Sequence, residues 1–178
     1  MAGVSAEVIT PELRALVGVE GPVRTAPSPL GRDALRRFVQ AAMEIDPIHW
    51  DDAAARAQGH DGVVAPPLYP LHAFPRPDGS PDPLAALDED PEWDGIELVE
   101  DGLPPLDVPL PRLLNGGVAA EVFALARIGD VISARSRYAE LTERAGRSGP
   151  MVLVVVETDY RDQTGRMLLR TRTTMIAR

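Results

Sequence analysis

Two long apolar, β-branched stretches near the C-terminus, separated by a short polar turn, limit the fold more than any other feature of this sequence. The stretches cover residues 151–160 and 167–176, with Asp162-Gln163-Thr164-Gly165 between them. Two such runs across a glycine-containing turn predict an antiparallel hairpin. Because the first run is apolar on both faces, we expect it to be a central strand that is covered on both sides.

Further strands are expected before this hairpin, so that the last third of the chain forms an antiparallel meander. One is predicted over residues 112–127, with an interruption at Gly116-Gly117, and the next over residues 131–145. The turn between them falls at Ile128-Gly129-Asp130. Alternating apolar and polar residues in the second of these segments are typical of a strand with one covered face.

The first half of the chain has the periodicity of helices. Apolar residues recur at spacings of three and four from Leu35 to Ala42, which predicts an amphipathic helix over residues 32–43. A further apolar piece at residues 68–74 is expected to form a short buried helix. Helices followed by an antiparallel meander indicate the α+β class.

Length and composition narrow the possible functions. A chain of 178 residues suits one domain, here taken as 1–178, and its formal charge of −9 argues against general binding of nucleic acids. The absence of cysteine excludes disulfides, thiolate metal sites and thiol nucleophiles. The longest apolar run, residues 151–156, is too short to span a membrane, and no basic segment with an apolar one after it opens the chain. We therefore expect a cytoplasmic protein.

Residues 75–111 differ in composition from the rest of the chain, because prolines alternate there with acidic residues. Such a segment predicts a long irregular excursion with little regular structure. Segments of this length inside a compact domain are usually either functional or mobile. We interpret it as a lid over a substrate tunnel or a partner subunit, with a partly ordered loop as the alternative.

The segment that carries candidate chemistry follows the predicted helix, in residues 44–51. Glu44 and His49 stand five residues apart, across Pro47, which forces Asp46 out of the helical region and makes the segment a true loop. A carboxylate and an imidazole on one loop can together hold and deprotonate a water, or pass a proton to a leaving hydroxyl. Asp46 also has a simpler interpretation, since an acidic residue before proline often holds the turn through its own backbone.

This loop resembles the acid-x-Asn/Asp-Pro-x-His signature of the MaoC-like (R)-specific hydratases and dehydratases. More narrowly, the chain resembles their FAS1-like dehydratase branch, which often forms the N-terminal half of a double hot dog. Three blocks carry the resemblance: residues 42–51, continuing through Gly59 to Val63-Val64-Ala65-Pro66-Pro67; Leu114-Asn115-Gly116-Gly117 with Glu121 and Gly129-Asp130; and residues 146–151. The resemblance implies a hot-dog fold, a long curved antiparallel sheet wrapped around a central helix.

The resemblance also implies the function and the site. Glu44 and His49 match the catalytic acid and histidine of a hydro-lyase that acts on (3R)-3-hydroxyacyl or trans-2-enoyl thioesters of coenzyme A or acyl carrier protein. Substrate-binding positions are then Asp46, Asn115, Gly116 and Gly117. No metal and no cofactor are implied, apart from the coenzyme A or phosphopantetheine of the substrate. The implied partners are a second copy of the chain or a MaoC-like subunit, in fatty acid or polyketide metabolism.

Three departures from the family pattern leave alternatives open. Met43 precedes Glu44 where glycine is usual, so the loop is expected to be one residue short and less free to turn. Pro66-Pro67 replaces His-Gly, and proline has no N–H group for a thioester oxyanion. Asn115 stands where the branch often has histidine and cannot shuttle protons. A non-catalytic, acyl-binding subunit of a heteromer is therefore the alternative, and a hot-dog thioesterase is a third.

Two other groups of residues bear on binding. His49, His60 and His72 have no tight spacing and make a poor metal site. Four arginines of the strand region could meet the phosphates of coenzyme A or pantetheine, although arginines there more often form a solvated strand face. They are Arg135, Arg137, Arg144 and Arg147.

Overall fold

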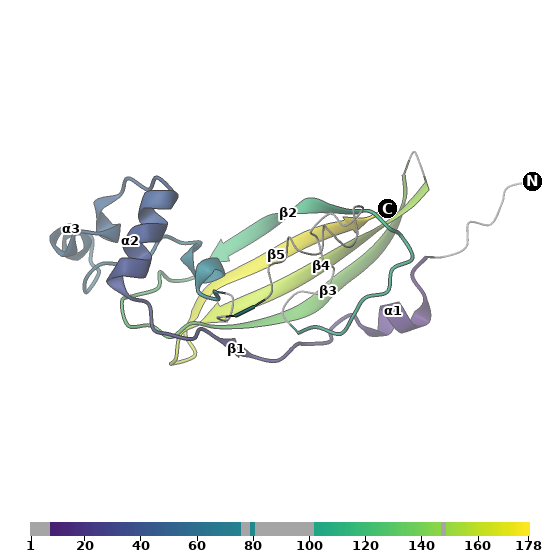
Figure 1. The fold of residues 1–178 in the computed structure, drawn as a ribbon, viewed down its shortest axis with the longest axis horizontal. Coiled ribbons are helices and arrows are strands. Elements are labelled where there is room, and N and C mark those ends of the chain that lie inside the picture. Colours follow the sequence, from purple (N-terminus) through teal and green to yellow (C-terminus); the bar gives the residue numbers. More distant parts are fainter. Residues whose placement is uncertain (1–7, 76–78, 81–101, 147–148) are drawn as a thin grey trace, which may run out of the picture.

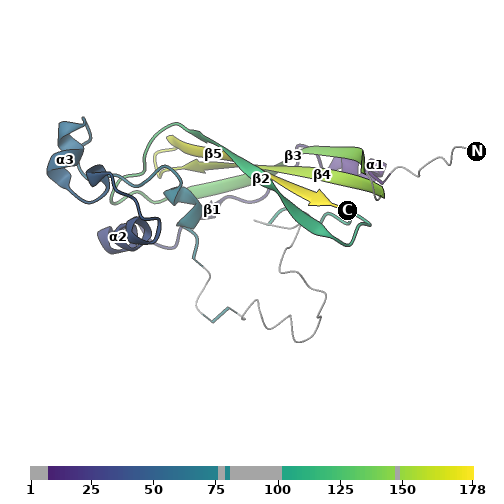
Figure 2. The same ribbon diagram turned by 90° about the horizontal axis from the view of Figure 1, so that it is seen from above.

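A five-stranded antiparallel sheet with the strand order β1-β3-β4-β5-β2 dominates the computed structural model (Figure 1). The structure describes residues 8–75, 79–80, 102–146 and 149–178. From above, the sheet is strongly twisted, and β2 crosses over β5 (Figure 2). The strands are β1 (Arg24–Thr25), β2 (Leu113–Val122), β3 (Ser133–Gly146), β4 (Gly149–Arg161) and β5 (Met167–Ala177). The predicted α+β class and the predicted hairpin, now β4 and β5, are confirmed.

The turn between β4 and β5 is held by one carboxylate. Asp162 Oδ1 accepts hydrogen bonds from the backbone N–H groups of Thr164 (2.8 Å) and Arg166 (3.0 Å), and its Oδ2 accepts one from Arg166 Nε (2.7 Å). Burial by itself raises the pKa of Asp162, but these hydrogen bonds outweigh burial and hold the pKa at about 2. The turn therefore depends on an ionised aspartate.

Acid is expected to weaken the fold through Asp162. Because the folded pKa lies below the unfolded one, the ionised group stabilises the protein above about pH 4, and this contribution is lost as the pH falls towards 2. The difference in melting temperature between the wild type and Asp162→Asn should thus be largest near neutral pH and shrink between about pH 4 and pH 2. A difference that stays constant from pH 6 to pH 2 would contradict this role.

The helices gather at the two ends of the described sheet instead of along its middle (Figure 1). At one end lie α2 and α3, and at the other lies α1, which begins after the N-cap Thr10. The helical segments are α1 (Pro11–Ala15), α2 (Arg32–Ala41), the 3-10 turn η1 (Pro47–His49), α3 (Asp52–Ala57) and the 3-10 turn η2 (Tyr69–His72).

The short helix expected at residues 68–74 is only the single turn η2, and it is only partly buried. Tyr69 and Pro70 are buried, but Leu68 and Leu71 are 45% and 38% exposed. Pro70 suits the first turn of a helix, but it cannot continue one, and Pro75 follows soon after.

Two of the three core clusters lie on the same face of the sheet, and the third is a small cluster of Ile48, Ala55 and Val64. The first joins α2 to the sheet through Leu35 and Val39, which pack with Ile132, Leu168 and other apolar residues. The second covers the other half, where Tyr138 is fully buried against β4 residues and the chain around residues 103–106. The Tyr138 hydroxyl donates to the Pro104 carbonyl (2.7 Å), so this part of the proline-rich segment is fixed on the sheet. The lid proposed for that segment falls mostly on residues 76–78 and 81–101, which lie outside the described residues.

The opposite face of the sheet carries charges where an apolar cover was expected. Glu157, on β4, accepts hydrogen bonds from Arg137 on β3 (2.7 Å) and Arg172 on β5 (3.0 Å). Burial raises the pKa of Glu157, but the hydrogen bond from Arg137 and the charges of Arg170 and Arg172 outweigh burial and lower it. Leu153 and Val155, on the same face, are partly exposed. The central strand is thus fully covered on one side only.

Strand β2 ends earlier than the predicted 112–127, at Val122. After this point Phe123 and Ala124 both donate to the carbonyl of Leu168, and the chain then pairs with the segment around Val64. As the last strand of the sheet, β2 has one edge that no described strand covers, and nine of its ten residues are exposed. This edge is available for pairing with another chain.

Candidate functional site

The loop that carries Glu44 and His49 begins where α2 ends, in a Schellman motif. The N–H of Glu44 donates to the carbonyl of Val39 (3.0 Å), and that of Met43 donates to Gln40 (3.2 Å). Met43 takes the left-handed conformation (φ 53°), which usually falls to glycine. Met43 therefore adopts the backbone conformation that glycine usually supplies at this position. This conformation is strained for a residue that has a side chain.

Met43→Gly is expected to raise the free energy of unfolding by about 1 kcal/mol, because glycine removes the left-handed strain. The Met43 side chain is 83% exposed, so little apolar burial is lost. Ala42→Gly is the matched control: Ala42 is right-handed (φ −77°) and should lose roughly 0.5–1 kcal/mol. Thermal unfolding of the variants decides between these outcomes, and a lower melting temperature for Met43→Gly would refute the strain.

The carboxylates of the loop hold its backbone. Glu44 Oε1 accepts hydrogen bonds from the N–H groups of Ile45 (2.8 Å) and Asp46 (3.2 Å). Asp46 Oδ1 accepts one from Ile48 (3.1 Å) and caps η1, in the turn-holding role that proline suggested. Glu44 Oε2 has no hydrogen-bond partner among the described residues. One oxygen of Glu44 is thus anchored and the other is available.

His49 is 5% exposed, and one of its nitrogens is fixed. Nδ1 lies 2.8 Å from the carbonyl oxygen of Val64, so the proton on that nitrogen is donated to the backbone and Nε2 is left as the acceptor. Val64 is in turn paired with Arg127, which ties the imidazole to the chain that leaves β2. Within the described ranges no group bonds Nε2, and no buried polar atom lacks a partner, so Nε2 reaches solvent. The ring is positioned for proton transfer through that one atom.

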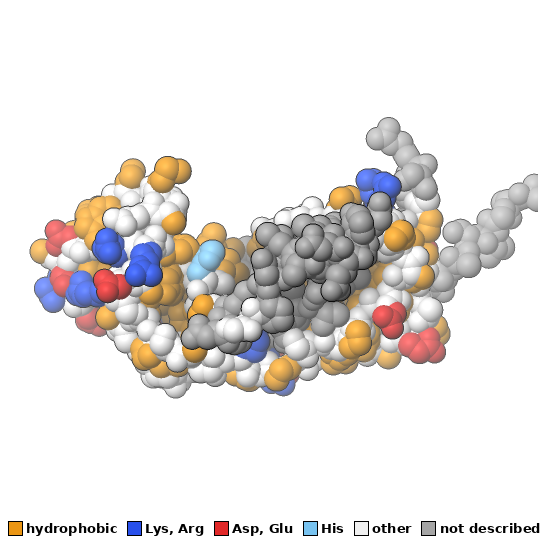
Figure 3. Space-filling model, in the orientation of Figure 1, with side chains coloured by type: hydrophobic (Ala, Val, Ile, Leu, Met, Phe, Trp, Pro, Cys, Tyr) orange, Lys and Arg blue, Asp and Glu red, His pale blue; other side chains and the backbone are white. Residues whose placement is uncertain are grey.

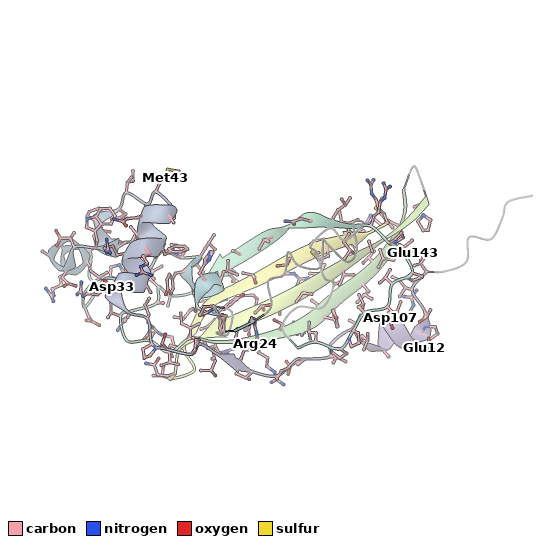
Figure 4. All side chains as sticks on the ribbon, viewed as in Figure 1. Glu12, Arg24, Asp33, Met43, Asp107 and Glu143 are labelled. Carbon is pink, nitrogen blue, oxygen red and sulfur yellow. The ribbon has the colours of Figure 1, made fainter. Side chains whose placement is uncertain are left out.

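The structure does not join Glu44 and His49 by a hydrogen bond. His49 lines a cavity of about 170 Å³ with residues from the start of α2, including Arg32, Asp33 and Arg36. Glu44 instead follows Met43, which lies at the other end of α2 from Asp33 (Figure 4). The two side chains must therefore meet through a shared water or substrate for the acid–base pair to work.

The Asn115-Gly116-Gly117 block forms a bulge in β2. The pairing with β5 shifts between Asn115 and Gly117, and Asn115 Oδ1 accepts a hydrogen bond from Gly117 N (2.7 Å). A Cβ at Gly116 would meet the Thr174 backbone oxygen at 3.0 Å, and Gly117 has φ +107°, so the bulge requires both glycines. The bulge lies near the start of β2, at the end of the sheet away from α2 and α3 (Figure 1). Within one chain this block is separate from the His49 loop.

Pro66 and Pro67 have no backbone N–H group, but the residue after them, Leu68, has one. Tyr69 N donates to the Pro66 carbonyl (3.0 Å), which closes the first turn after Pro67. The N–H of Leu68 donates to no acceptor within the described ranges. It is the first N–H after the prolines and can meet a ligand oxygen.

Two further features of the described residues bear on function. They contain no group of three or more His, Cys, Asp or Glu side chains that could hold a metal ion. None of their helices is long and apolar enough to cross a membrane.

Comparison with known proteins places the chain in a family. The sequence model of the FAS1-like, dehydratase domain region matches residues 15–171. The chain belongs to this family. A UPF0336 protein of Streptomyces griseus is 27% identical over 149 residues, which cover 84% of each chain.

Two further comparisons concern this FAS1-like dehydratase domain: a solved complex and a hydratase subunit. The solved ChsH1-ChsH2 complex from Mycobacterium tuberculosis contains a chain that superimposes with a TM-score of 0.69, covering 94% of this chain and 96% of that one, at 15% identity. This likeness shows the fold, and the hot-dog architecture is thereby confirmed. A shorter match of 44 residues, 48% identical, links 25% of this chain to 14% of the 3-oxo-4,17-pregnadiene-20-carboxyl-CoA hydratase alpha subunit of M. tuberculosis.

Sequence reasoning missed the arginines of α2 beside His49. They appeared only as the polar face of an amphipathic helix, and nothing in their spacing indicated that His49 would pack against them. The cavity itself brings together α2, η1 and Val63, which are separate in the sequence.

Proposed function

We propose that this chain is a hydro-lyase subunit that interconverts (3R)-3-hydroxyacyl and trans-2-enoyl thioesters of coenzyme A or acyl carrier protein. The observation that carries the proposal is the fixed tautomer of His49, whose Nδ1 is bonded to the Val64 carbonyl and whose Nε2 is available. Membership of a dehydratase family supports the reaction class. The reaction uses no metal and no cofactor beyond the carrier of the acyl group.

In the hydration direction, Glu44 and His49 hold one water between them. The pair takes a proton from this water as its oxygen bonds to C3 of the enoyl group, and a proton is delivered to C2. Dehydration reverses these steps, so the pair removes the C2 proton and protonates the departing 3-hydroxyl. The Leu68 N–H is the candidate donor to the thioester oxygen as negative charge develops there.

A second candidate is a non-catalytic subunit that binds the acyl chain and completes a heteromer. It is favoured by the lack of a direct Glu44–His49 contact and by Pro66-Pro67. The solved complex to which the chain is similar is itself an assembly of two kinds of subunit. In this case a MaoC-like partner supplies the acid–base pair.

Either candidate needs a partner along β2. Val118 and Val122 are 55% and 45% exposed on this edge strand and would be covered by a second chain. Antiparallel pairing of two β2 strands would place the Asn115–Gly117 bulge of one subunit near the end of the partner's β2, and so towards its His49 loop. Asn115, Gly116 and Gly117 could then contribute to a shared substrate site, together with Asp46.

Loss of the conjugated enoyl-thioester absorbance, followed over a trans-2-enoyl-CoA series, tests the proposal. The purified chain is assayed alone and together with a MaoC-like subunit. Hydration by the chain alone supports the hydro-lyase. Activity that requires the added subunit and survives loss of His49 in this chain supports the acyl-binding subunit. Inactivity in both settings would overturn both candidates.

A further inference from the structure

A second cavity lies beside the one that His49 lines. A cavity of about 260 Å³ is lined by Arg32 and Val63, which also line the His49 cavity, and by Arg56 and Arg127. The two cavities therefore adjoin at Arg32 and Val63. We call the two adjoining cavities the arginine groove and define it by Arg32, Arg36, Arg56 and Arg127, with His49 in one of the two cavities.

Two of these arginines have ion pairs that leave most of their donors unused. Arg32 Nη2 contacts Asp52 Oδ2 (2.6 Å), and Arg127 Nη1 contacts Asp61 Oδ2 (2.8 Å). A guanidinium has five N–H donors, and each contact uses one of its nitrogens. Asp52 is further engaged, since its Oδ1 accepts from Val63 N (2.9 Å). That hydrogen bond, and then Arg32, lower the pKa of Asp52 and keep it ionised.

The other two arginines of the groove are available to a ligand. Neither Arg36 nor Arg56 has a hydrogen bond or an ion pair within residues 8–75, 102–146 and 149–178. The groove thus carries four guanidinium groups against the carboxylates of Asp33, Asp52 and Asp61, in a chain whose formal charge is −9. Arginine side chains gather at this helical end of the molecule, over α2 and α3 (Figure 3).

The arginines of the strand region, in contrast, are paired with carboxylates where the structure gives their contacts. Arg135 is paired with Glu20 (2.8 Å), and Arg137 with the buried Glu157 (2.7 Å). These two therefore form the solvated strand face that the sequence favoured. Arg147 lies outside the described residues.

We infer that the arginine groove binds the phosphate of 4′-phosphopantetheine, the arm that carries the acyl thioester in both coenzyme A and acyl carrier protein. Arginine suits this group because its planar fork matches phosphate oxygens and stays charged. His49 lines one of the two cavities, so a phosphate held in the groove brings the arm beside the proposed catalytic residue. The identity of the ligand rests on the proposed function, but its binding can be measured without catalysis.

Titration calorimetry with 4′-phosphopantetheine and with pantetheine, which lacks the phosphate, tests the site. Phosphopantetheine should bind about tenfold or more tightly, as expected for charge-assisted hydrogen bonds. Arg36→Gln and Arg56→Gln should each weaken its binding by about tenfold and leave pantetheine unaffected. Arg37→Gln is the matched control, because Arg37 is an exposed arginine of α2, as Arg36 is, but does not line the groove. Equal binding of the two compounds, or equal weakening by Arg37→Gln, would overturn the inference.

The same variants identify the source of the phosphate. Weaker binding of coenzyme A by Arg36→Gln and Arg56→Gln assigns the groove to coenzyme A, and weaker binding of a phosphopantetheinylated carrier protein assigns it to that protein. If phosphopantetheine binds as expected but no thioester is hydrated, the proposed catalysis fails and the groove stands. If thioesters are hydrated with unchanged KM in both variants, the groove fails and the catalysis stands.

Discussion

Substituting asparagine for His49 is expected to lower the rate of enoyl-thioester hydration by about 10²- to 10⁴-fold, the usual contribution of a general acid or base. The asparagine amide can donate to the Val64 carbonyl as Nδ1 now does at 2.8 Å, so the loop keeps its anchor. The asparagine side chain has no second nitrogen that exchanges protons. The substitution therefore removes only the proton transfer at Nε2. The measurement is the initial rate of absorbance loss at saturating and at low substrate.

A matched variant separates chemistry from folding in this experiment. Glu44→Gln retains an oxygen for the N–H groups of Ile45 and Asp46, but removes the negative charge. Both variants should melt near the wild-type temperature while they lose activity. Full activity in His49→Asn would show that the imidazole only supports the loop, and the acyl-binding candidate would then be preferred.

Tyr138→Ala is expected to lower the free energy of unfolding by about 3–5 kcal/mol, which is a large part of the stability of a typical domain. Tyr138 is fully buried in the second core cluster, and its removal leaves a cavity between β3 and the segment that holds Leu103 and Leu106. The segment would also lose its hydrogen bond to the tyrosine hydroxyl. Urea unfolding followed by circular dichroism measures the change.

The control for this variant is Tyr138→Phe, which keeps the ring and loses only the hydroxyl. It should lower the free energy of unfolding by roughly 1 kcal/mol, the usual net contribution of one hydrogen bond. Similar losses in the two variants would mean that the hydrogen bond to Pro104, and not packing of the ring, holds residues 103–106 on the sheet.

The candidate loop was predictable because its signals are local. Pro47 ends any helix before it, and an acidic residue followed by proline indicates a capped turn, as Asp46 and η1 show. The conformation of Met43 was not predictable. Nothing in its side chain favours a left-handed backbone, and only the Schellman hydrogen bonds of Glu44 and Met43 to α2 impose it.

Other parts of the site depend on contacts between distant segments. The tautomer of His49 is set by the carbonyl of Val64, whose position depends in turn on pairing with Arg127. Regular pairing of β2 with β5 ends at Val122, because Phe123 and Ala124 share one carbonyl of β5 and the chain beyond them pairs with the segment around Val64. The periodicity of the sequence does not indicate where this pairing with β5 stops. The predicted strand therefore extended five residues beyond the end of β2.

The sequence by itself determined the α+β class, the β4–β5 hairpin, the break at Pro47 and the identity of the residues on the candidate loop. Each rests on side-chain periodicity, a turn sequence or the fixed geometry of proline, all of which act over a few residues. Tertiary structure alone decided which nitrogen of His49 is available, where Glu44 lies relative to it, and which arginines surround it. These follow from the packing of α2, η1 and the chain beyond β2. Residues from Arg32 to Val63 line the cavity of His49, and Arg127 pairs with Val64, whose carbonyl holds the ring.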